Sequence, residues 1–242
     1  MKFATAKLHI YEITFITLQG KFMLMRPRTI VFFLFVLLLP ACIEAKKPKP
    51  AVVRLETTMG IMRVELSDDT PHHRDNFLRL AREGRLDSTL FHRVIKNFMI
   101  QGGDPQSLVK THDSIDYTLP AEFRLPWLFH VRGALAAARE SDDVNPEMRS
   151  SGSQFYIIYG QSWSENSLGK VRGMLDEKGI EMNREMWDAY LQHGGSPHLD
   201  GTYTVFGHII EGMKVLKQIQ AVATDGNDRP VEPVILLRAV VE

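Results

Sequence analysis

Short runs in which charged and apolar positions alternate begin at Val52 and recur to the end of the chain. In residues 53–57 and 62–66, charged residues alternate with apolar or β-branched ones, and a turn containing Gly60 separates the two runs. Alternation with a period of two predicts strands buried on one face, and two such runs around a glycine turn predict a hairpin. Further strands are expected at residues 90–94, 98–101, 134–138, 155–159, 204–210 and 234–241.

Two helices are expected at positions far apart in the sequence. Thr70 followed by Pro71 is typical of a helix start, with Thr70 as the N-cap residue, and Gly84 marks the end of this helix. A shorter helix is expected after Gly212. Many short strands, two distant helices and no regular alternation of strand with helix indicate a mainly β protein whose sheet closes into an antiparallel barrel.

The segment at about residues 162–195 differs from the rest of the chain. It is rich in charge, and Met186, Trp187, Tyr190 and Leu191 recur at helical spacing. We interpret it as a helical insertion packed on the barrel. Its stripe of methionine and aromatic side chains is interpreted as a packing surface rather than a ligand site.

The first 41 residues indicate export. Arg26 and Arg28 precede an apolar run at residues 29–39, which is too short for the roughly 20 residues that a membrane-spanning helix needs. We therefore interpret residues 1–41 as a signal segment, in which residues 1–22 are an over-extended start.

The residues before Cys42 resemble the bacterial lipobox, whose cysteine is acylated and becomes the first residue of the mature protein. Residues 42–51, rich in lysine and proline, are then a lipidated tether to the domain at residues 52–242. This predicts anchoring to a membrane of the cell envelope, facing the periplasm. The outer membrane is preferred because Ile43, and not aspartate, follows the cysteine. An uncleaved signal anchor with an incidental cysteine is the alternative.

Composition narrows the classes of partner. The chain has 29 basic and 29 acidic residues, and 44% of its residues are hydrophobic. Without residues 1–41 the balance is 24 basic to 28 acidic, so no basic surface favours a nucleic-acid partner. Cys42 is the only cysteine in the sequence, which excludes an intrachain disulfide.

Three blocks of sequence carry the strongest functional signal. Residues 91–104 read FHRVIKNFMIQGGD; residues 133–138 and 152–157 read GALAAA and GSQFYI; residues 199–201 and 205–207 read LDG and VFG. In this order they closely resemble the cyclophilin-type peptidyl-prolyl cis-trans isomerases, over roughly residues 52–241. The resemblance implies a closed eight-stranded barrel capped by two helices, and binding of proline-containing polypeptide segments. We expect a monomer.

The chemistry of X-Pro isomerisation asks for few groups. Rotation about the amide bond must overcome a barrier of roughly 18–20 kcal/mol, but no bond is made or broken. No metal or other cofactor is therefore required, and a site that favours the twisted amide suffices. Twisting makes the prolyl nitrogen more basic, and Arg93 is the candidate donor to it because its guanidinium is always charged.

The resemblance also implies an apolar pocket for the proline ring beside Arg93. Gln101 is expected to assist catalysis, and Gln154 to hold substrate carbonyls or orient Arg93. The complete set of expected substrate-binding residues is Phe98, Met99, Ala138, Gln154, Tyr156, Leu199 and Tyr203.

The chain departs from the family pattern at four positions near this pocket, one of which is Arg139 in place of a common asparagine. Tyr156 stands where phenylalanine is usual, which adds a hydroxyl to the pocket wall. Tyr203 stands where many members have histidine. His198 replaces a tryptophan of many eukaryotic members, which predicts weak binding of cyclosporin.

The sequence leaves one alternative function open and argues against a metal site and a hydrolase. A non-catalytic module that binds proline segments, or a chaperone, is the alternative to an enzyme. His72 and His73 are adjacent and have no histidine or cysteine partner at ligand spacing, so no metal site is expected. Ser153 lacks a matched His-Asp set, which argues against a hydrolase.

Overall fold

The computed structural model describes residues 50–107 and 114–242. The expected signal segment and Cys42 lie outside these residues, so the predictions made for them stay predictions. Among the helices of the described ranges, none has the length and apolar character needed to cross a membrane.

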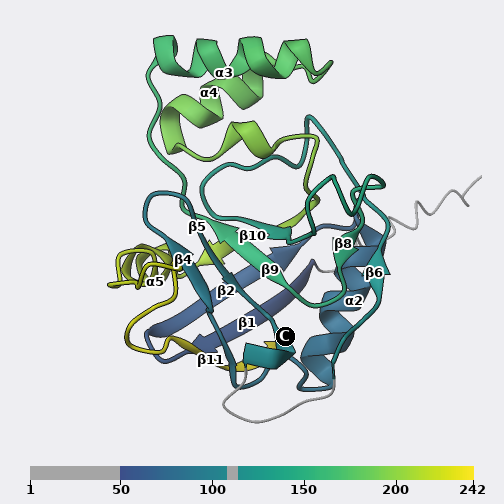
Figure 1. Cartoon of the computed structure of the whole chain (residues 1–242), viewed down its shortest axis with the longest axis vertical. Coiled ribbons are helices and arrows are strands. Elements are labelled where there is room, and N and C mark those ends of the chain that lie inside the picture. Colours follow the sequence, from purple (N-terminus) through teal and green to yellow (C-terminus); the bar gives the residue numbers. More distant parts are fainter. Residues whose placement is uncertain (1–49, 108–113) are drawn as a thin grey trace, which may run out of the picture. The chain divides into compact units, whose positions relative to one another are not determined.

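Nine antiparallel strands form one sheet, in the order β3-β11-β1-β2-β10-β7-β9-β5-β4 (Figure 1). Their bounds are β1 Ala51–Thr57, β2 Gly60–Leu66, β3 Thr89–Leu90, β4 Arg93–Ile95, β5 Met99–Gly102, β7 Ala134–Ala137, β9 Phe155–Ile158, β10 Val205–Glu211 and β11 Ile235–Val241. A separate pair joins β6 (Thr118–Leu119) to β8 (Ser150–Ser151). Two short 3-10 helices, η1 (Pro105–Ser107) and η2 (Pro197–Leu199), lie between these elements.

The sheet is strongly curled, so that its two edge strands, β3 and β4, come from one short segment of the sequence. β3 and β4 stand at opposite ends of the strand order, yet only Phe91 and His92 separate them in the sequence. The single strand expected at residues 90–94 is therefore two short strands, each paired to a different neighbour. A closed eight-stranded barrel is not reproduced: the curled sheet has nine strands, and within the described residues β3 and β4 share no ladder.

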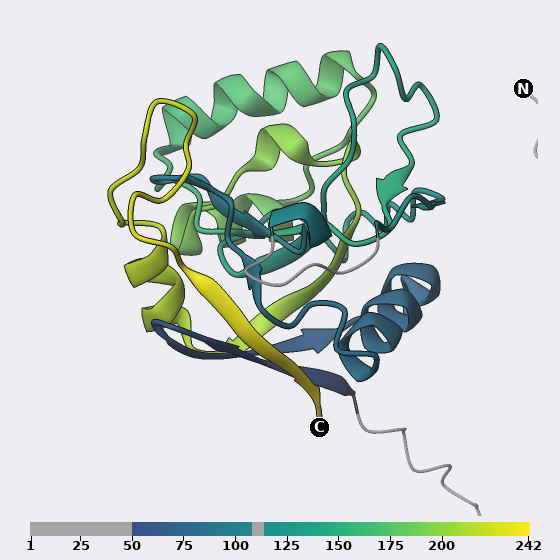
Figure 2. The same cartoon turned by 60° about the horizontal axis from the view of Figure 1, so that its bottom comes forward.

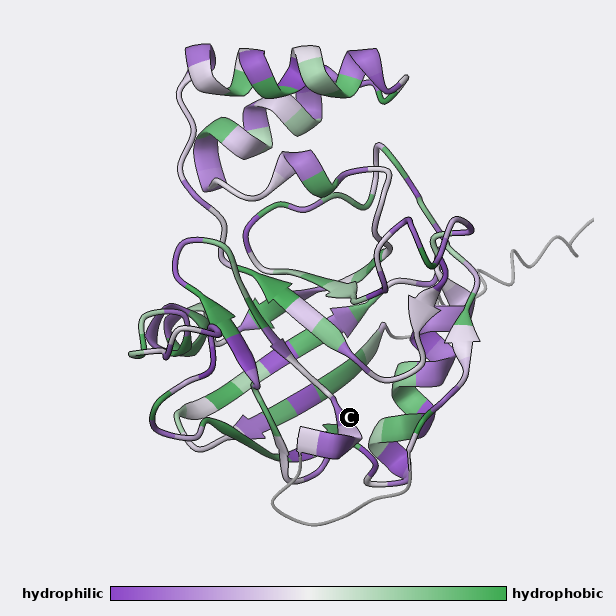
Figure 3. Cartoon of the chain, viewed as in Figure 1, coloured by the Kyte–Doolittle hydropathy of each residue, from purple (hydrophilic) through white to green (hydrophobic). Residues whose placement is uncertain are grey.

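The main hydrophobic core fills the inside of the curled sheet. Along β1 and β2, green hydrophobic and purple hydrophilic positions alternate (Figure 3), and the apolar ones, such as Val53, Leu55 and Val64, are fully buried. Two helices, α2 (Pro71–Arg82) and α5 (Met213–Ile219), lie on opposite sides of the sheet in both views (Figures 1 and 2). Phe77 of α2 reaches this core and packs edge-on against Phe155 of β9, with ring centroids 5.4 Å apart.

The start of α2 differs from the sequence prediction. Thr70 precedes the helix, but its side chain makes no capping hydrogen bond. Instead the carboxylate of Glu122 accepts hydrogen bonds from the backbone N–H groups of His72 at 3.3 Å and His73 at 3.0 Å. A group about 50 residues away therefore satisfies the free donors of the first turn. Gly84 follows the helix with φ +65°, the left-handed conformation that favours glycine.

Two helices occupy the segment expected to be a helical insertion: α3 (Glu165–Glu177) and α4 (Arg184–His193). Ser164 and Asn183 cap their N-termini through side-chain oxygens, which accept from the backbone N–H groups of Ser167 and Met186. The helices stack on one side of the curled sheet, beyond η2 (Figure 1). Their own core is made of Leu168, Leu175, Met182, Met186 and Tyr190.

Candidate active site

Four strands align a row of side chains across the outer face of the sheet. Arg93 of β4 lies directly opposite Gln101 of β5, and Gln101 lies opposite Tyr156 of β9. Tyr156 in turn lies opposite Ala136 of β7. Directly opposed residues of antiparallel strands project from the same face of the sheet, so the register alone brings these side chains together.

The neighbouring positions on the same strands face the opposite way. Val94, Ile100 and Ile157 each sit next to a member of the row, and all three are buried in the core inside the sheet. Met99, Ala136 and Tyr156 belong to a second, smaller apolar cluster. The candidate site therefore lies outside the curl, on a face where alternation places polar and apolar residues next to one another.

A pocket of about 350 Å³ opens on this face. Eight of the nine residues expected to form the proline site line it, together with Arg139. The lining residues are Arg93, Phe98, Met99, Gln101, Ala138, Arg139, Tyr156, Leu199 and Tyr203. Met99 and Tyr156, two of its lining residues, are buried, with 2% and 5% of their surface exposed.

Gln154 stands beside this pocket and does not line it. Its side-chain oxygen accepts a hydrogen bond of 3.0 Å from Nε2 of Gln101. It borders a larger groove of about 650 Å³, which shares Gln101, Ala138 and Arg139 with the pocket. The pocket and the groove therefore adjoin along these residues.

Arg93 lies at the edge of the pocket with its side chain 46% exposed. Its Nε is 3.4 Å from Oδ2 of Asp228, a residue that the sequence analysis did not identify. The turn at residues 225–229 presents Asp228, because the carboxylate of Asp225 accepts hydrogen bonds from the backbone N–H groups of Asn227 and Arg229. These bonds lower the pKa of Asp225 below its ordinary value. The backbone carbonyl of Asp228 also accepts from the N–H of Val94, next to Arg93.

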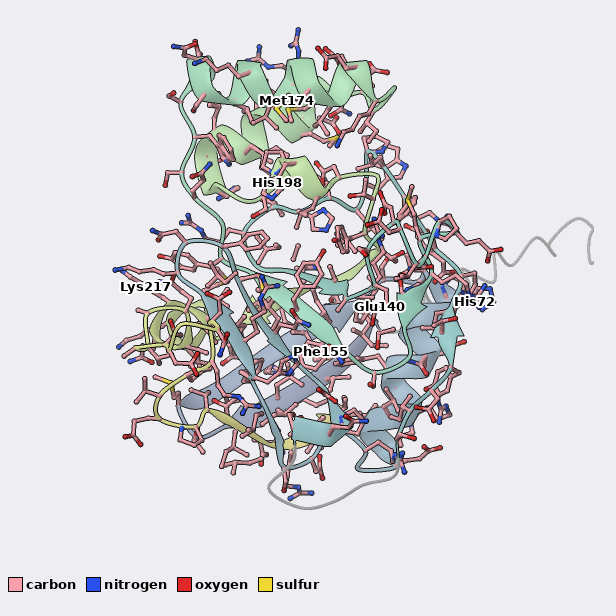
Figure 4. The ribbon with its side chains drawn as sticks, in the orientation of Figure 1. His72, Glu140, Phe155, Met174, His198 and Lys217 are labelled. Carbon is pink, nitrogen blue, oxygen red and sulfur yellow. The ribbon has the colours of Figure 1, made fainter. Side chains whose placement is uncertain are left out.

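His198 contacts the ring of Phe98, one of the pocket residues. Their ring centroids are 5.6 Å apart and the planes are tilted by 32°. Figure 4 shows His198 between the sheet and the insertion that carries Met174. Partial desolvation by the surrounding protein lowers the pKa of His198 below its ordinary value.

Arg139 holds another wall of the pocket. Its guanidinium lies over the ring of Tyr203, 4.5 Å from the ring centroid. Its Nε donates a 2.8 Å hydrogen bond to the backbone carbonyl of Thr202. The arginine therefore packs on Tyr203 and ties down the loop that carries it.

Behind the pocket, Tyr156 is linked to two buried residues, His130 and Asp200, that the sequence analysis did not assign to the site. Its hydroxyl is 3.0 Å from Nε2 of His130, and Nδ1 of His130 is 2.8 Å from Oδ1 of Asp200. Burial first, and then the neighbouring Tyr203 and Asp200, raise the pKa of Tyr156 well above its ordinary value. The signal available in the sequence was the polar character of His130 within an apolar segment.

The geometry offers little for a metal or cofactor. Over residues 50–107 and 114–242, no group of three or more histidine, cysteine, aspartate or glutamate side chains is placed to hold a metal ion. His73 hydrogen-bonds through Nδ1 to Glu122 at 2.7 Å and through Nε2 to Ser150 at 2.9 Å, so both ring nitrogens are engaged. The site can offer hydrogen-bond donors, chiefly the guanidinium of Arg93, next to the apolar side chains of the pocket.

Comparison with known proteins agrees with this geometry. The family model described as "Cyclophilin type peptidyl-prolyl cis-trans isomerase/CLD" matches residues 52–241. A peptidyl-prolyl cis-trans isomerase of Arabidopsis thaliana is 30% identical over 193 residues, covering 79% of this chain and 94% of that protein. A Streptococcus pyogenes protein, whose name joins a phosphatase to a peptidyl-prolyl cis-trans isomerase, is 36% identical over 193 residues. The match covers 76% of this chain and 37% of the streptococcal protein.

Solved structures show the same fold. A cyclophilin type peptidyl-prolyl cis-trans isomerase of Cryptosporidium parvum gives a TM-score of 0.59 at 26% identity, covering 80% of this chain and 98% of that one. A second structure of that protein, in the presence of the dipeptide Ala-Pro, gives a TM-score of 0.58 at 27% identity, with coverage of 79% and 98%.

Proposed function

Because this chain belongs to the cyclophilin-type peptidyl-prolyl cis-trans isomerases, we propose that it catalyses rotation about X-Pro peptide bonds. One observation carries the proposal: the strand register sets Arg93 on the same face as an apolar pocket for the proline ring, with Gln101 between Arg93 and Tyr156. The substrate class is proline-containing polypeptide. The Ala-Pro dipeptide used with the Cryptosporidium parvum protein supports that choice.

The pocket acts first on the planar amide. Phe98, Met99 and Leu199 surround the proline ring and displace water from the adjoining peptide group. Water stabilises the charge-separated, planar form of an amide, so its removal destabilises the ground state relative to the twisted form. The pocket therefore lowers the rotational barrier and also binds the substrate.

Arg93 acts on the twisted amide. When the C–N bond rotates, the prolyl nitrogen loses conjugation and gains a lone pair that accepts a hydrogen bond. The guanidinium of Arg93 lines the pocket, stays charged and has N–H groups free of Asp228, which contacts only Nε. A donor whose bond forms only in the transition state accelerates the reaction and does not merely tighten binding.

Gln101 and Gln154 position the substrate backbone. The amide group of Gln101 is fixed by its hydrogen bond to Gln154, which leaves the oxygen of Gln101 as an acceptor on the pocket side. Gln154 keeps its own amide N–H groups for a substrate carbonyl in the neighbouring groove. Together they hold one side of the X-Pro bond while the other side rotates.

We further propose that the protein works as a monomer in the cell envelope, where it assists the folding of exported proteins. The apolar run at residues 29–39 and the position of Cys42 support a lipid anchor. Replacing Cys42 with serine should release the protein from the membrane fraction and abolish labelling with a radioactive fatty acid. Retention of the variant in the membrane would favour an uncleaved signal anchor instead.

Exchange spectroscopy by NMR, on an Ala-Pro peptide with a catalytic amount of protein, tests the activity. Uncatalysed exchange takes tens of seconds or longer, so cross-peaks between the cis and trans forms appear only with catalysis. The expected result is strong exchange cross-peaks. A protein that shifts the peptide resonances without producing cross-peaks would be the non-catalytic binding module.

A further inference from the structure

A buried chain of hydrogen bonds runs from the helical insertion to the wall of the pocket. It begins on α4, where the hydroxyl of Tyr190 donates to Oδ2 of Asp200 at 2.6 Å. Oδ1 of Asp200 lies 2.9 Å from the backbone nitrogen of His130 and 2.8 Å from its Nδ1. The chain ends where Nε2 of His130 meets the hydroxyl of Tyr156 at 3.0 Å.

The donors and acceptors along this chain can be assigned. Asp200 is 1% exposed, and a buried carboxylate is tolerated only where hydrogen bonds satisfy it. Its donors are the Tyr190 hydroxyl, the His130 backbone N–H and the His130 Nδ1–H. In the tautomer that carries its proton on Nδ1 alone, His130 presents Nε2 as an acceptor for the hydroxyl of Tyr156.

Both tyrosines remain donors over the physiological range. Burial first, and then the charge of Asp200, raise the pKa of Tyr190 well above its ordinary value. Tyr156 behaves in the same way. Tyr190 therefore donates to the carboxylate of Asp200 throughout this range.

The chain supports several walls of the pocket at once. The imidazole of His130 stacks on the ring of Tyr156, with centroids 6.1 Å apart and an interplanar angle of 11°. The ring of Tyr203 stands edge-on to both, at 5.9 Å from Tyr156 and 6.5 Å from His130. Asp200 directly follows Leu199, a third lining residue. Movement of Asp200 or His130 would therefore displace several walls.

We propose that Tyr190, Asp200 and His130 are positioning residues of the proline pocket, and that the helical insertion thereby forms part of the isomerase site. The inference rests on the proposed function, because it assigns these residues to the site of that reaction. None of the three lines the pocket, so they act through the lining residues next to them, chiefly Tyr156, which is hydrogen-bonded to His130. The insertion then determines how tightly the proline ring is held.

A double-mutant cycle tests this coupling. Tyr190→Phe removes one hydroxyl and keeps the ring, and Asp200 retains its two donors from His130. We expect KM to rise about 3- to 10-fold, the range of one hydrogen bond, with kcat changed less than about twofold. Tyr156→Phe removes the hydroxyl that ends this series of hydrogen bonds. In that background, Tyr190→Phe should therefore change KM less than about twofold. Tyr159→Phe, outside both the pocket and the chain, is the matched control and should leave KM unchanged.

Two outcomes would overturn the inference: no effect of Tyr190→Phe on KM, or the same rise in both backgrounds. A second readout does not depend on catalysis or on the folding of Tyr190→Phe. Titration of the wild-type protein with an Ala-Pro peptide should shift the ring resonances of His130, although His130 is 1% exposed, and Tyr156→Phe should abolish the shift. An unshifted His130 with bound peptide would contradict the coupling. If wild type binds the peptide but does not isomerise it, the proposed function alone fails.

Discussion

Arg93 and Asp228 form an ion pair beside the proline pocket, with Nε of Arg93 3.4 Å from Oδ2 of Asp228. Both side chains are nearly half exposed, at 46% and 42%, and such pairs are worth about 0–1 kcal/mol. Asp228 therefore steers the guanidinium without immobilising it. In the proposed mechanism, Arg93 is therefore available to the substrate nitrogen, which becomes an acceptor only when the amide twists.

The first prediction concerns this pair. Asp228→Asn removes the charge that orients Arg93 and keeps the size of the side chain. We expect kcat/KM to fall about 2- to 5-fold, in line with the small energy of an exposed pair. Asp188→Asn on α4, which removes an exposed partner of Arg184, should have no effect. A fall of a hundredfold or more for Asp228→Asn would show that Asp228 takes part in the reaction directly.

The second prediction concerns the two glutamines. In Gln154→Ala the amide of Gln101 loses its partner and can rotate, so substrate positioning weakens. We expect kcat/KM to fall about 3- to 10-fold, the range of one hydrogen bond, and Gln101→Ala to cost at least as much. The exposed Gln218→Ala on α5 serves as the control. If Gln154→Ala costs clearly more than Gln101→Ala, Gln154 contacts the reacting bond itself.

The third prediction is a dependence of stability on pH. Burial lowers the pKa of His73 below its ordinary value, despite the neighbouring Glu122. The unfolded chain therefore binds a proton near the ordinary pKa of about 6.5, whereas the folded chain resists it, so stability falls as pH drops below about 6.5. Glu122 adds to the loss at lower pH. Burial opposes the ionisation of Glu122, but hydrogen bonds from His73 and from two backbone N–H groups lower its pKa overall. The ionised Glu122 therefore stabilises the fold, and this stabilisation is lost as pH falls through the lowered pKa of the folded state.

Urea unfolding midpoints between pH 8 and pH 4 measure this dependence. The midpoint should be level at the upper end and decline below about pH 6.5. His73→Gln lacks the titrating group and should decline less steeply between about pH 6.5 and 5. His208→Gln, at an exposed position of β10, should decline as wild type does. A midpoint that stays constant across this range would disprove the role of His73.

The fourth prediction concerns the packing of the insertion. Met186 is fully buried in the core of α3 and α4, whereas Met174 on α3 is 56% exposed. Met186→Ala should therefore lower the free energy of unfolding by about 2–5 kcal/mol, and Met174→Ala should change it by less than about 0.5 kcal/mol. Chemical denaturation measures both. Equal, small effects would mean that the insertion is not a packed part of the domain.

The sequence predicted the features that depend on local pattern. Alternation in residues 53–57 and 62–66 identified the first hairpin, and helical spacing identified the insertion. The motif around Arg93 and Phe98 indicated residues that the structure gathers around one pocket. Local spacing was enough for these features because neighbours in the sequence share a strand or a helix face.

Features that depend on distant pairing could not be predicted in this way. Asp228 meets Arg93 from 135 residues away, and His130 meets Asp200 from 70 residues away. Thr70 has the residue type of an N-cap, but the carboxylate of Glu122 accepts the hydrogen bonds from the first backbone N–H groups of α2. The folded chain brings Glu122 to this helix end from about 50 residues away. No periodicity in a single sequence encodes such contacts, so the contacts of Asp228, His130 and Asp200 are seen only in the folded chain.

The central claim is that Arg93 stabilises the twisted amide, and one comparison tests it most directly. Cis-trans exchange rates and peptide affinity are measured on the same NMR samples for wild type, Arg93→Ala and Arg93→Lys, with the exposed Arg238→Ala of β11 as a control. We expect Arg93→Ala to lower kcat/KM by about a hundredfold or more, with peptide affinity kept within about threefold. Arg93→Lys should keep part of the wild-type rate, and the control Arg238→Ala should isomerise the peptide at the wild-type rate. An Arg93→Ala protein that isomerises the peptide at the wild-type rate would contradict the account.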